Sequence, residues 1–219
     1  MEFLDKIEVE PKKIANSTVI CLHGLGANGA DFKPMISELK LPKTSQIRFI
    51  LPSAPKIPVT INGGLFMPAW YDIQEMSLER KINEAQLQKS AASIHALINK
   101  ELKRGIDSKN IIIAGFSQGG AVALHAGLTY PKRLSGILAM STYFATAKSI
   151  NIALANKDLP IQFFHGIYDS VIPETQAKNS VESLLNLGLS PKYQSFSMDH
   201  SLCLEEISAI SEWIQSLIK

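Results

Sequence analysis

The sequence predicts an α/β fold in which helices flank a mostly parallel, doubly wound sheet. Short apolar runs alternate with longer stretches of helical periodicity along its 219 residues. Most of these runs lack polar alternation, which is typical of strands that are buried on both faces. Alternating strands and helices connect through right-handed crossovers into a single sheet. No repeat or linker interrupts this pattern, so we expect one domain over residues 1–219.

Each expected element follows from its local pattern. The six apolar runs that predict strands are Thr18–Leu22, Ile47–Leu51, Ile111–Phe116, Gly136–Met140, Ile161–Phe164 and Tyr193–Phe196. Apolar residues spaced three or four apart predict helices over Leu87–Leu102 and Ile207–Leu217. A further helix is expected over Pro173–Leu187, with Gly188 as its C-cap. The stretch Pro52–Asp72 fits neither period, and a loop of that length in a compact domain is usually functional.

The composition is that of an ordinary globular protein, with 46% hydrophobic and 19% charged residues. The net charge is +2 and no run of Lys or Arg occurs, which argues against nucleic-acid binding and against an electrostatic membrane anchor. The two cysteines, Cys21 and Cys203, are typical of a reducing compartment. No apolar run approaches the ~18 residues that span a bilayer. We therefore expect a cytoplasmic protein without a membrane anchor, and the sequence leaves open whether it is a monomer or a homodimer.

A candidate nucleophile lies where the third expected strand ends. Ser117 is the centre of a G-x-S-x-G motif at Gly115–Gly119, which follows the apolar run Ile111–Ala114 and precedes the helix-compatible stretch Gly120–Leu124. This context is that of a nucleophile elbow, a strained strand-to-helix turn that lifts the serine hydroxyl above the sheet. The alternative is a glycine-rich turn that closes an ordinary strand–helix unit.

A serine hydroxyl becomes an effective nucleophile when a base takes its proton and a third group orients that base. In sheets with a nucleophile elbow, the chain order is serine, then acid, then histidine. Of the five histidines, only His165 and His200 follow Ser117, and only His200 leaves room for an acid between them. We therefore expect His200 to be the base; the alternative is a surface histidine.

Asp169 is the expected acid, because it follows the strand at Ile161–Phe164 and so lies at the carboxyl edge of the sheet. Asp158 precedes that strand and lies at the opposite edge. Two glutamates belong to the helix that begins at Pro173, and Asp199 is too close in sequence to orient the ring of its neighbour. The alternative for Asp169 is a turn or helix N-terminal carboxylate.

Two backbone N–H groups are expected to bind the oxyanion of a tetrahedral intermediate. One belongs to Gln118, which follows the nucleophile at a helix N-terminus, where the helix dipole also favours negative charge. The other is assigned to Leu25, in the glycine-rich loop His23–Gly29 after the first expected strand. A dinucleotide-binding loop is the weaker alternative, because a third glycine at the fingerprint spacing is missing.

The motifs together resemble a known family. They are Cys21–Gly26, Met67–Asp72, Gly115–Gly120, His165–Pro173 and Asp199–Glu206. In this order they are similar to the acyl-protein thioesterase and small carboxylesterase branch of the α/β-hydrolases. The Trp-Tyr-Asp element and the Gly-Phe-Ser-Gln-Gly-Gly string are specific to that branch. The chain departs after Tyr143, where the family commonly continues with Leu-Pro and this sequence has Phe144–Ala147.

The resemblance implies an α/β-hydrolase fold with a minimal flap and no large cap domain. It implies hydrolysis of carboxylic esters and acyl thioesters through a Ser-His-Asp triad and an acyl-enzyme, with no cofactor and no metal. The implied substrates are small acyl esters or thioesters, acylated proteins or lysophospholipids. The competing functions are a lysophospholipase and a non-catalytic binding protein on the same scaffold.

The loop Pro58–Asp72 resembles the family's short flap beside the acyl groove. We expect Leu65, Met67 and Trp70 to form part of the wall of that groove. The alternative is a loop that its aromatic residues hold against the core.

Overall fold

Seven strands form the central sheet of the computed structural model, which describes residues 4–42, 44–75 and 80–218. Their order is β1-β3-β2-β8-β9-β10-β11. Their bounds are β1 Lys6–Val9, β2 Ser17–Leu22, β3 Ile47–Pro52, β8 Ile111–Phe116, β9 Gly136–Met140, β10 Ile161–Gly166 and β11 Lys192–Phe196. All neighbours run parallel except β1, which pairs antiparallel with β3 at the edge. The mostly parallel sheet predicted from the sequence is confirmed.

All six predicted strands are present, and the sequence analysis missed only β1 in this sheet. In that strand Lys6 and Glu8 alternate with Ile7 and Val9, and all four residues are only partly buried. An edge strand of four half-exposed residues leaves no apolar run in the sequence.

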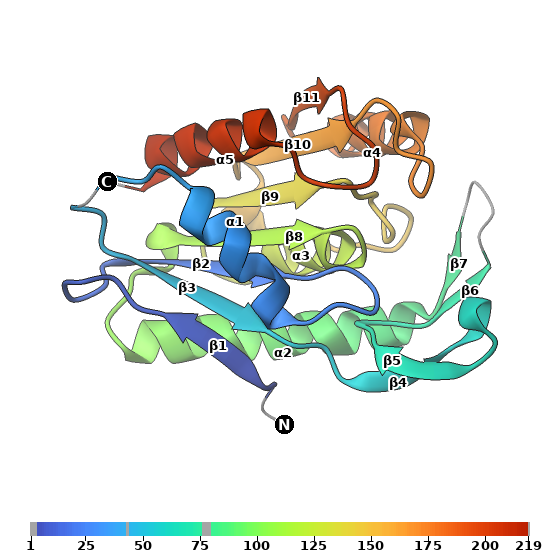
Figure 1. Ribbon diagram of the computed structural model, residues 1–219, viewed down its shortest axis with the longest axis horizontal. Coiled ribbons are helices and arrows are strands. Elements are labelled where there is room, and N and C mark those ends of the chain that lie inside the picture. The colour runs from blue at the N-terminus through green and yellow to red at the C-terminus, as the bar shows by residue number, and fades with distance from the viewer. Residues whose placement is uncertain (1–3, 43, 76–79, 219) are drawn as a thin grey trace.

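Helices cover both faces of the sheet (Figure 1). Their bounds are α1 Lys33–Glu38, α2 Glu84–Lys103, α3 Gln118–Thr129, α4 Glu174–Asn186 and α5 Leu204–Leu217. Single 3-10 turns lie at η1 Gly29–Phe32, η2 Thr60–Asn62, η3 Ser108–Asn110 and η4 Leu154–Asn156. In Figure 1, α1 and α5 lie in front of the sheet, and α2, α3 and α4 lie behind it. Within the described residues, no helix is both long and apolar enough to cross a membrane.

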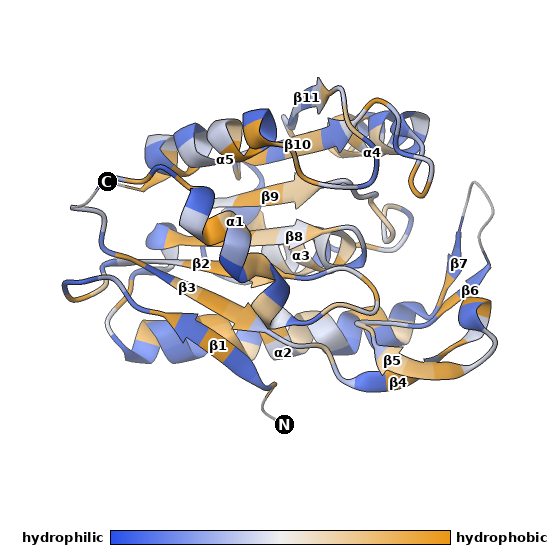
Figure 2. Ribbon diagram, viewed as in Figure 1, coloured by the Kyte–Doolittle hydropathy of each residue, from blue (hydrophilic) through white to orange (hydrophobic). Residues whose placement is uncertain are grey.

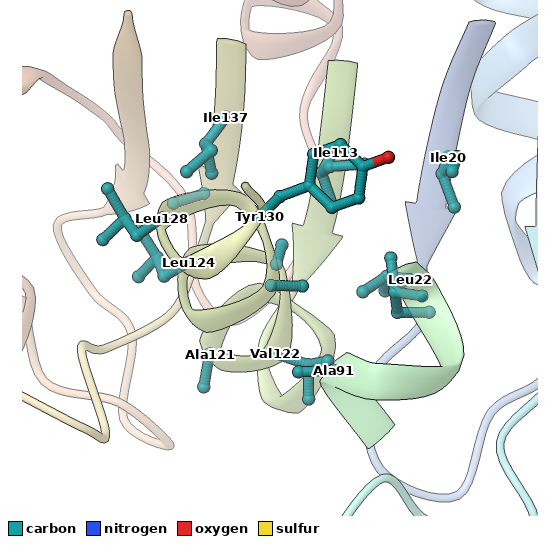
Figure 3. Packing of buried hydrophobic residues seen from close by; sticks show 14 of the residues in the cluster. Ile20, Leu22, Ala91, Ile113, Ala121, Val122, Leu124, Leu128, Tyr130 and Ile137 are labelled. Atoms are coloured by element: carbon teal, nitrogen blue, oxygen red, sulfur yellow. The ribbon is translucent and has the colours of Figure 1, made fainter. Parts of the chain in front are cut away.

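The core is divided by the sheet into two hydrophobic clusters. In β2, Ile20 and Leu22 belong to the cluster under α2 and α3, whereas Val19 and Cys21 belong to the cluster under α1 and α5. Figure 2 shows the consequence as hydrophobic strands between helices of mixed polarity. Figure 3 shows how α3 presents its apolar residues to the neighbouring strands. The sheet is therefore buried on both faces, as the unalternating apolar runs predict.

Two small hairpins extend beyond the carboxyl edge of the sheet, at the right of Figure 1. They pair β4 Lys56–Val59 with β5 Leu65–Pro68, and β6 Ile73–Glu75 with β7 Lys81–Ile82. The prediction of a structureless loop over Pro52–Asp72 is therefore wrong. Strands of four residues that contain proline do not show the period of a strand, and proline is tolerated in a two-stranded ribbon. Gly63 and Gly64, at φ 66° and 78°, make the turn between β4 and β5.

Candidate active site

Ser117 lies on a sharp turn between β8 and α3, with φ 53° and ψ −120°, a strained conformation for a residue with a side chain. Packing requires its glycines. A Cβ atom on Gly115 would lie 2.3 Å from the Gly119 carbonyl oxygen, and one on Gly119 would lie 2.2 Å from the Leu22 carbonyl oxygen. The Ser117 N–H donates to the Met140 carbonyl at 2.9 Å, which attaches the turn to β9. The local sequence therefore holds the hydroxyl above the edge of the sheet.

The structure brings Ser117, His200 and Asp169 together, although they are far apart in the sequence. His200 Nε2 lies 2.9 Å from Ser117 Oγ, and His200 Nδ1 lies 2.7 Å from Asp169 Oδ2. The other carboxylate oxygen of Asp169 accepts the N–H groups of Val171 and Ile172 at 2.9 and 2.8 Å. With a proton on Nδ1, His200 donates to Asp169 and can accept the proton of Ser117.

The surroundings of Asp169 keep it ionised. Burial opposes ionisation, but the hydrogen bonds from His200 and from the Ile172 N–H outweigh it, so the pKa of Asp169 lies below its usual 3.8. His165 lies beside it, with Nε2 3.5 Å from Asp169 Oδ2 and 2.8 Å from the Ile172 carbonyl oxygen. Burial lowers the pKa of His165 and favours its neutral form. Asp169 is therefore a fixed carboxylate next to His200.

Leu25 and Gln118 line the same pocket as Ser117. No hydrogen bond among the described residues uses the backbone N–H of either residue as a donor. The Leu25 loop is held in place because the neighbouring Gly26 N–H donates to the Pro68 carbonyl at 2.8 Å. Both N–H groups are thus free to donate to a bound oxygen.

The side chain of Gln118 connects this turn to the segment after β5, which sequence analysis did not foresee. Its Oε1 accepts the Trp70 N–H at 2.8 Å, and its Nε2 donates to the Tyr71 carbonyl at 2.7 Å. The Trp70 indole N–H donates to the His23 carbonyl at 2.8 Å. The sequence contains no signal for these contacts, because they join loops that meet only in the folded protein.

A pocket of about 330 Å³ opens beside Ser117 and His200. Its other lining residues include Leu25, Ile61, Tyr71, Ile73, Arg80, Tyr143 and Val171. The predicted groove residues Leu65, Met67 and Trp70 do not line it. Trp70 instead lies in the core and is 1% exposed. There its indole N–H donates to the His23 carbonyl, and its backbone N–H donates to the Gln118 side chain. Leu65, 65% exposed, and Met67 belong to β5 of the hairpin.

A second cavity of about 800 Å³ lies between the β3–β4 connection and α2, and Trp70 contributes to its wall. It contains none of the residues of the Ser117 pocket. Within the part of the chain that the structure describes, no group of three His, Cys, Asp or Glu residues is arranged to hold a metal ion.

The sequence and the fold both match known hydrolases. The family model described as Phospholipase/Carboxylesterase matches residues 5–218. Acyl-protein thioesterase 1 of Schizosaccharomyces pombe is 39% identical over 98% of this chain and 97% of its own length. Acyl-protein thioesterase 1 of Neurospora crassa is 37% identical over 90% of this chain and 85% of its own.

Among solved structures, SOBER1 of Arabidopsis thaliana superimposes with a TM-score of 0.87 at 29% identity, covering 94% of this chain and all of that one. Acyl-protein thioesterase 2 of Zea mays, at 24% identity, has a TM-score of 0.85 over 99% of this chain and supports the fold alone. The predicted resemblance is confirmed: the chain belongs to the phospholipase/carboxylesterase family of α/β-hydrolases and is an ester/thioester hydrolase.

Proposed function

We propose that this chain cleaves acyl esters and acyl thioesters with Ser117 as nucleophile, His200 as general base and acid, and Asp169 as the group that orients His200. The observation that carries the proposal is the pair of hydrogen bonds, 2.9 Å and 2.7 Å long, from Ser117 through His200 to Asp169. Both lie within the reach that proton transfer requires. The family membership supports the same chemistry.

The reaction proceeds in two halves. His200 Nε2 takes the Ser117 proton as Oγ attacks the acyl carbon, and the protonated ring then gives that proton to the departing alcohol or thiol. An acyl group is left on Ser117 Oγ. Water attacks this acyl-enzyme while His200 takes its proton, and the ring returns the proton to Ser117 as the carboxylic acid leaves.

The anionic oxygen of each tetrahedral intermediate binds the N–H groups of Leu25 and Gln118. Their freedom from other hydrogen bonds supports this role. The position of Gln118 at the start of α3 adds the positive end of a helix dipole. Each such donor typically contributes about 10²- to 10³-fold to kcat.

We propose that the substrates are acylated proteins and small acyl esters or thioesters. We also propose that the protein acts in the cytoplasm. The two relatives are both described as acyl-protein thioesterases. Aliphatic side chains of Ile61, Ile73 and Val171 in the Ser117 pocket suit an acyl chain. A thiol leaving group with a pKa near ~8.5 needs little protonation, so thioesters are cleaved alongside oxygen esters.

Kinetics of two variants test the assignment. We expect Ser117→Ala to lower kcat by ~10⁴-fold or more and to prevent labelling by a fluorophosphonate. Asp169→Asn is expected to lower kcat by ~10⁴-fold, because His200 would take the wrong tautomer. Both variants should melt near the wild-type temperature. Wild-type turnover by purified Ser117→Ala would contradict the mechanism.

A further inference from the structure

Arg80 brings a positive charge to the wall of the Ser117 pocket. It immediately precedes β7 and is only 9% exposed. Its guanidinium donates a hydrogen bond to the Val171 carbonyl oxygen, and its Cζ lies 5.1 Å from the centroid of the Tyr143 ring. Val171 and Tyr143 line the same pocket. The cation is therefore held between the segment after β10 and the segment after β9.

Within the part of the chain that the structure describes, Arg80 has no anionic partner. Its contacts among the described residues are the Val171 carbonyl oxygen and the ring and hydroxyl of Tyr143, and all of these are neutral. None of the ion pairs between described residues involves it. A guanidinium does not lose its proton in proteins. Buried charges are normally paired, so an unpaired one on a pocket wall is suited to an anion that enters from outside.

Further hydrogen-bonding groups lie next to the guanidinium. The hydroxyls of Tyr71 and Tyr143 are 2.9 Å apart, and both residues line the pocket. Burial raises the pKa of both tyrosines, so both keep their protons. Arg80 also has a φ of 26°, which is strained for a residue with a side chain, and such strain gathers at functional sites.

We propose that Arg80 binds a carboxylate of the substrate, so that the enzyme prefers esters and thioesters that carry this group. The inference rests on the proposed function, because it concerns a substrate bound beside Ser117. The planar guanidinium matches a carboxylate through two parallel hydrogen bonds. Ile61, Ile73 and Val171 line the same pocket and contact the methylene part of the substrate. The carboxylate belongs either to the end of the acyl chain or to the leaving group.

Two matched pairs of esters distinguish these sources. Mono-4-nitrophenyl adipate and 4-nitrophenyl hexanoate share six acyl carbons and differ in a terminal carboxylate. 4-Carboxyphenyl hexanoate and phenyl hexanoate differ in a carboxylate on the leaving group. The measurement is kcat/KM for each ester with the wild type, Arg80→Met and Lys81→Met. Lys81 is the control, because it is the neighbouring exposed cation and does not line the pocket.

In the wild type we expect the charged ester of one pair to be preferred, and that pair identifies the source. Arg80→Met should lower that preference by about 10-fold or more, because a hydrogen bond to a charged group is lost in a buried site. Lys81→Met should leave it unchanged within about two-fold, because this exposed charge is screened by solvent. Arg80→Lys, which keeps the charge without the paired hydrogen bonds, should restore part of it.

Three results would overturn the inference. The wild type could prefer the neutral ester in both pairs, a result that depends on no variant. Arg80→Met could lower kcat/KM equally for charged and neutral esters, which would make Arg80 a structural clamp. Lys81→Met could reduce the preference as much as Arg80→Met does. Failure of the proposed function gives a different result, namely undiminished hydrolysis of all four esters by Ser117→Ala.

Discussion

The nucleophile turn and the β4–β5 hairpin lie at the same edge of the sheet, but their glycines serve different purposes. In the turn, a Cβ atom on Gly119 would collide with the β2 backbone at 2.2 Å. In the hairpin, a Cβ atom on Gly64 would meet nothing within 4 Å, and glycine is needed only for φ 78°. Close packing against neighbouring backbone thus requires glycine in the nucleophile turn, whereas in the hairpin only the positive φ angle requires it. The turn that carries Ser117 therefore has no space for a side chain at Gly119, whereas the hairpin has space for one at Gly64.

The two regions are connected at one point. Ala69–Asp72, directly after the hairpin, is buried, although Phe66 four residues before Trp70 is 73% exposed. Gln118 of the turn binds the backbone on both sides of the Trp70–Tyr71 peptide bond. The position of the hairpin relative to Ser117 therefore depends on this buried segment.

Among the substitutions that compare the two regions, Gly119→Ala is expected to have the largest effect. Because the new Cβ meets backbone atoms, the turn must shift, and a displacement of about 1 Å at the reacting atoms costs ~10²-fold in rate. The matched control is Gly64→Ala, which has space but a left-handed φ and is expected to lose ~1 kcal/mol of stability with unchanged kcat/KM. Kinetics and thermal unfolding measure both. Equal kcat/KM values for the two variants would remove the distinction between the regions.

Glu206→Gln tests the effect of a fully buried carboxyl group on the pH dependence of stability. Glu206 lies in the first turn of α5, shortly after His200, and is 0% exposed; its carboxylate oxygens have no hydrogen-bond partner in the described structure. Burial raises its pKa from 4.5 to about 8. Between these pH values the unfolded chain loses the proton that the folded chain keeps, so the stability contributed below pH 4.5 is lost as pH rises to about 8.

We therefore expect Glu206→Gln to melt above the wild type at pH 9, with a gap that shrinks toward pH 5. For a chain of this size, each kcal/mol corresponds to about 2 to 4 °C in Tm. Thermal unfolding of both proteins from pH 5 to pH 9 measures the gap. A gap that stays constant with pH would show that Glu206 titrates normally.

Trp70→Phe examines the connection between the regions. It removes the indole hydrogen bond to the His23 carbonyl and leaves that oxygen unpaired, at a cost of about 1 to 3 kcal/mol. We expect a lower Tm and an unchanged dependence of kcat/KM on acyl chain length, because Trp70 does not line the Ser117 pocket. A flattened chain-length profile would instead restore the prediction that Trp70 is part of the groove wall.

Phe66→Ser is expected to have the smallest effect. The side chain is 73% exposed on β5, and substitutions at such positions change stability by about 0.5 kcal/mol or less. Tm and kcat/KM on short, water-soluble esters should remain those of the wild type. If Tm falls by more than about 5 °C, the hairpin contributes to the core more than its exposure indicates.

The sequence by itself determined the sheet and the chain positions of the candidate triad. Unbroken apolar runs specify buried parallel strands, and parallel strands present their carboxyl ends at one edge. Ser117 and Asp169 could therefore be assigned to that edge by their distance from the ends of their strands, and His200 by its place in the chain order. Gly115 and Gly119 belong to the same local pattern.

Only the tertiary structure decided which side chains surround that edge. The alternation in β1 spans only four residues, and the β4–β5 hairpin is interrupted by proline, so neither gives a clear strand signal in the sequence. Pairing rather than burial defines both. Trp70 contacts Gln118, and Arg80 contacts Val171 and Tyr143, across distances along the chain that no local pattern encodes. Whether an aromatic residue lines a pocket or lies in the core depends on the hydrogen bonds that it forms in the folded protein. Trp70 forms them with the His23 carbonyl and the Gln118 side-chain amide.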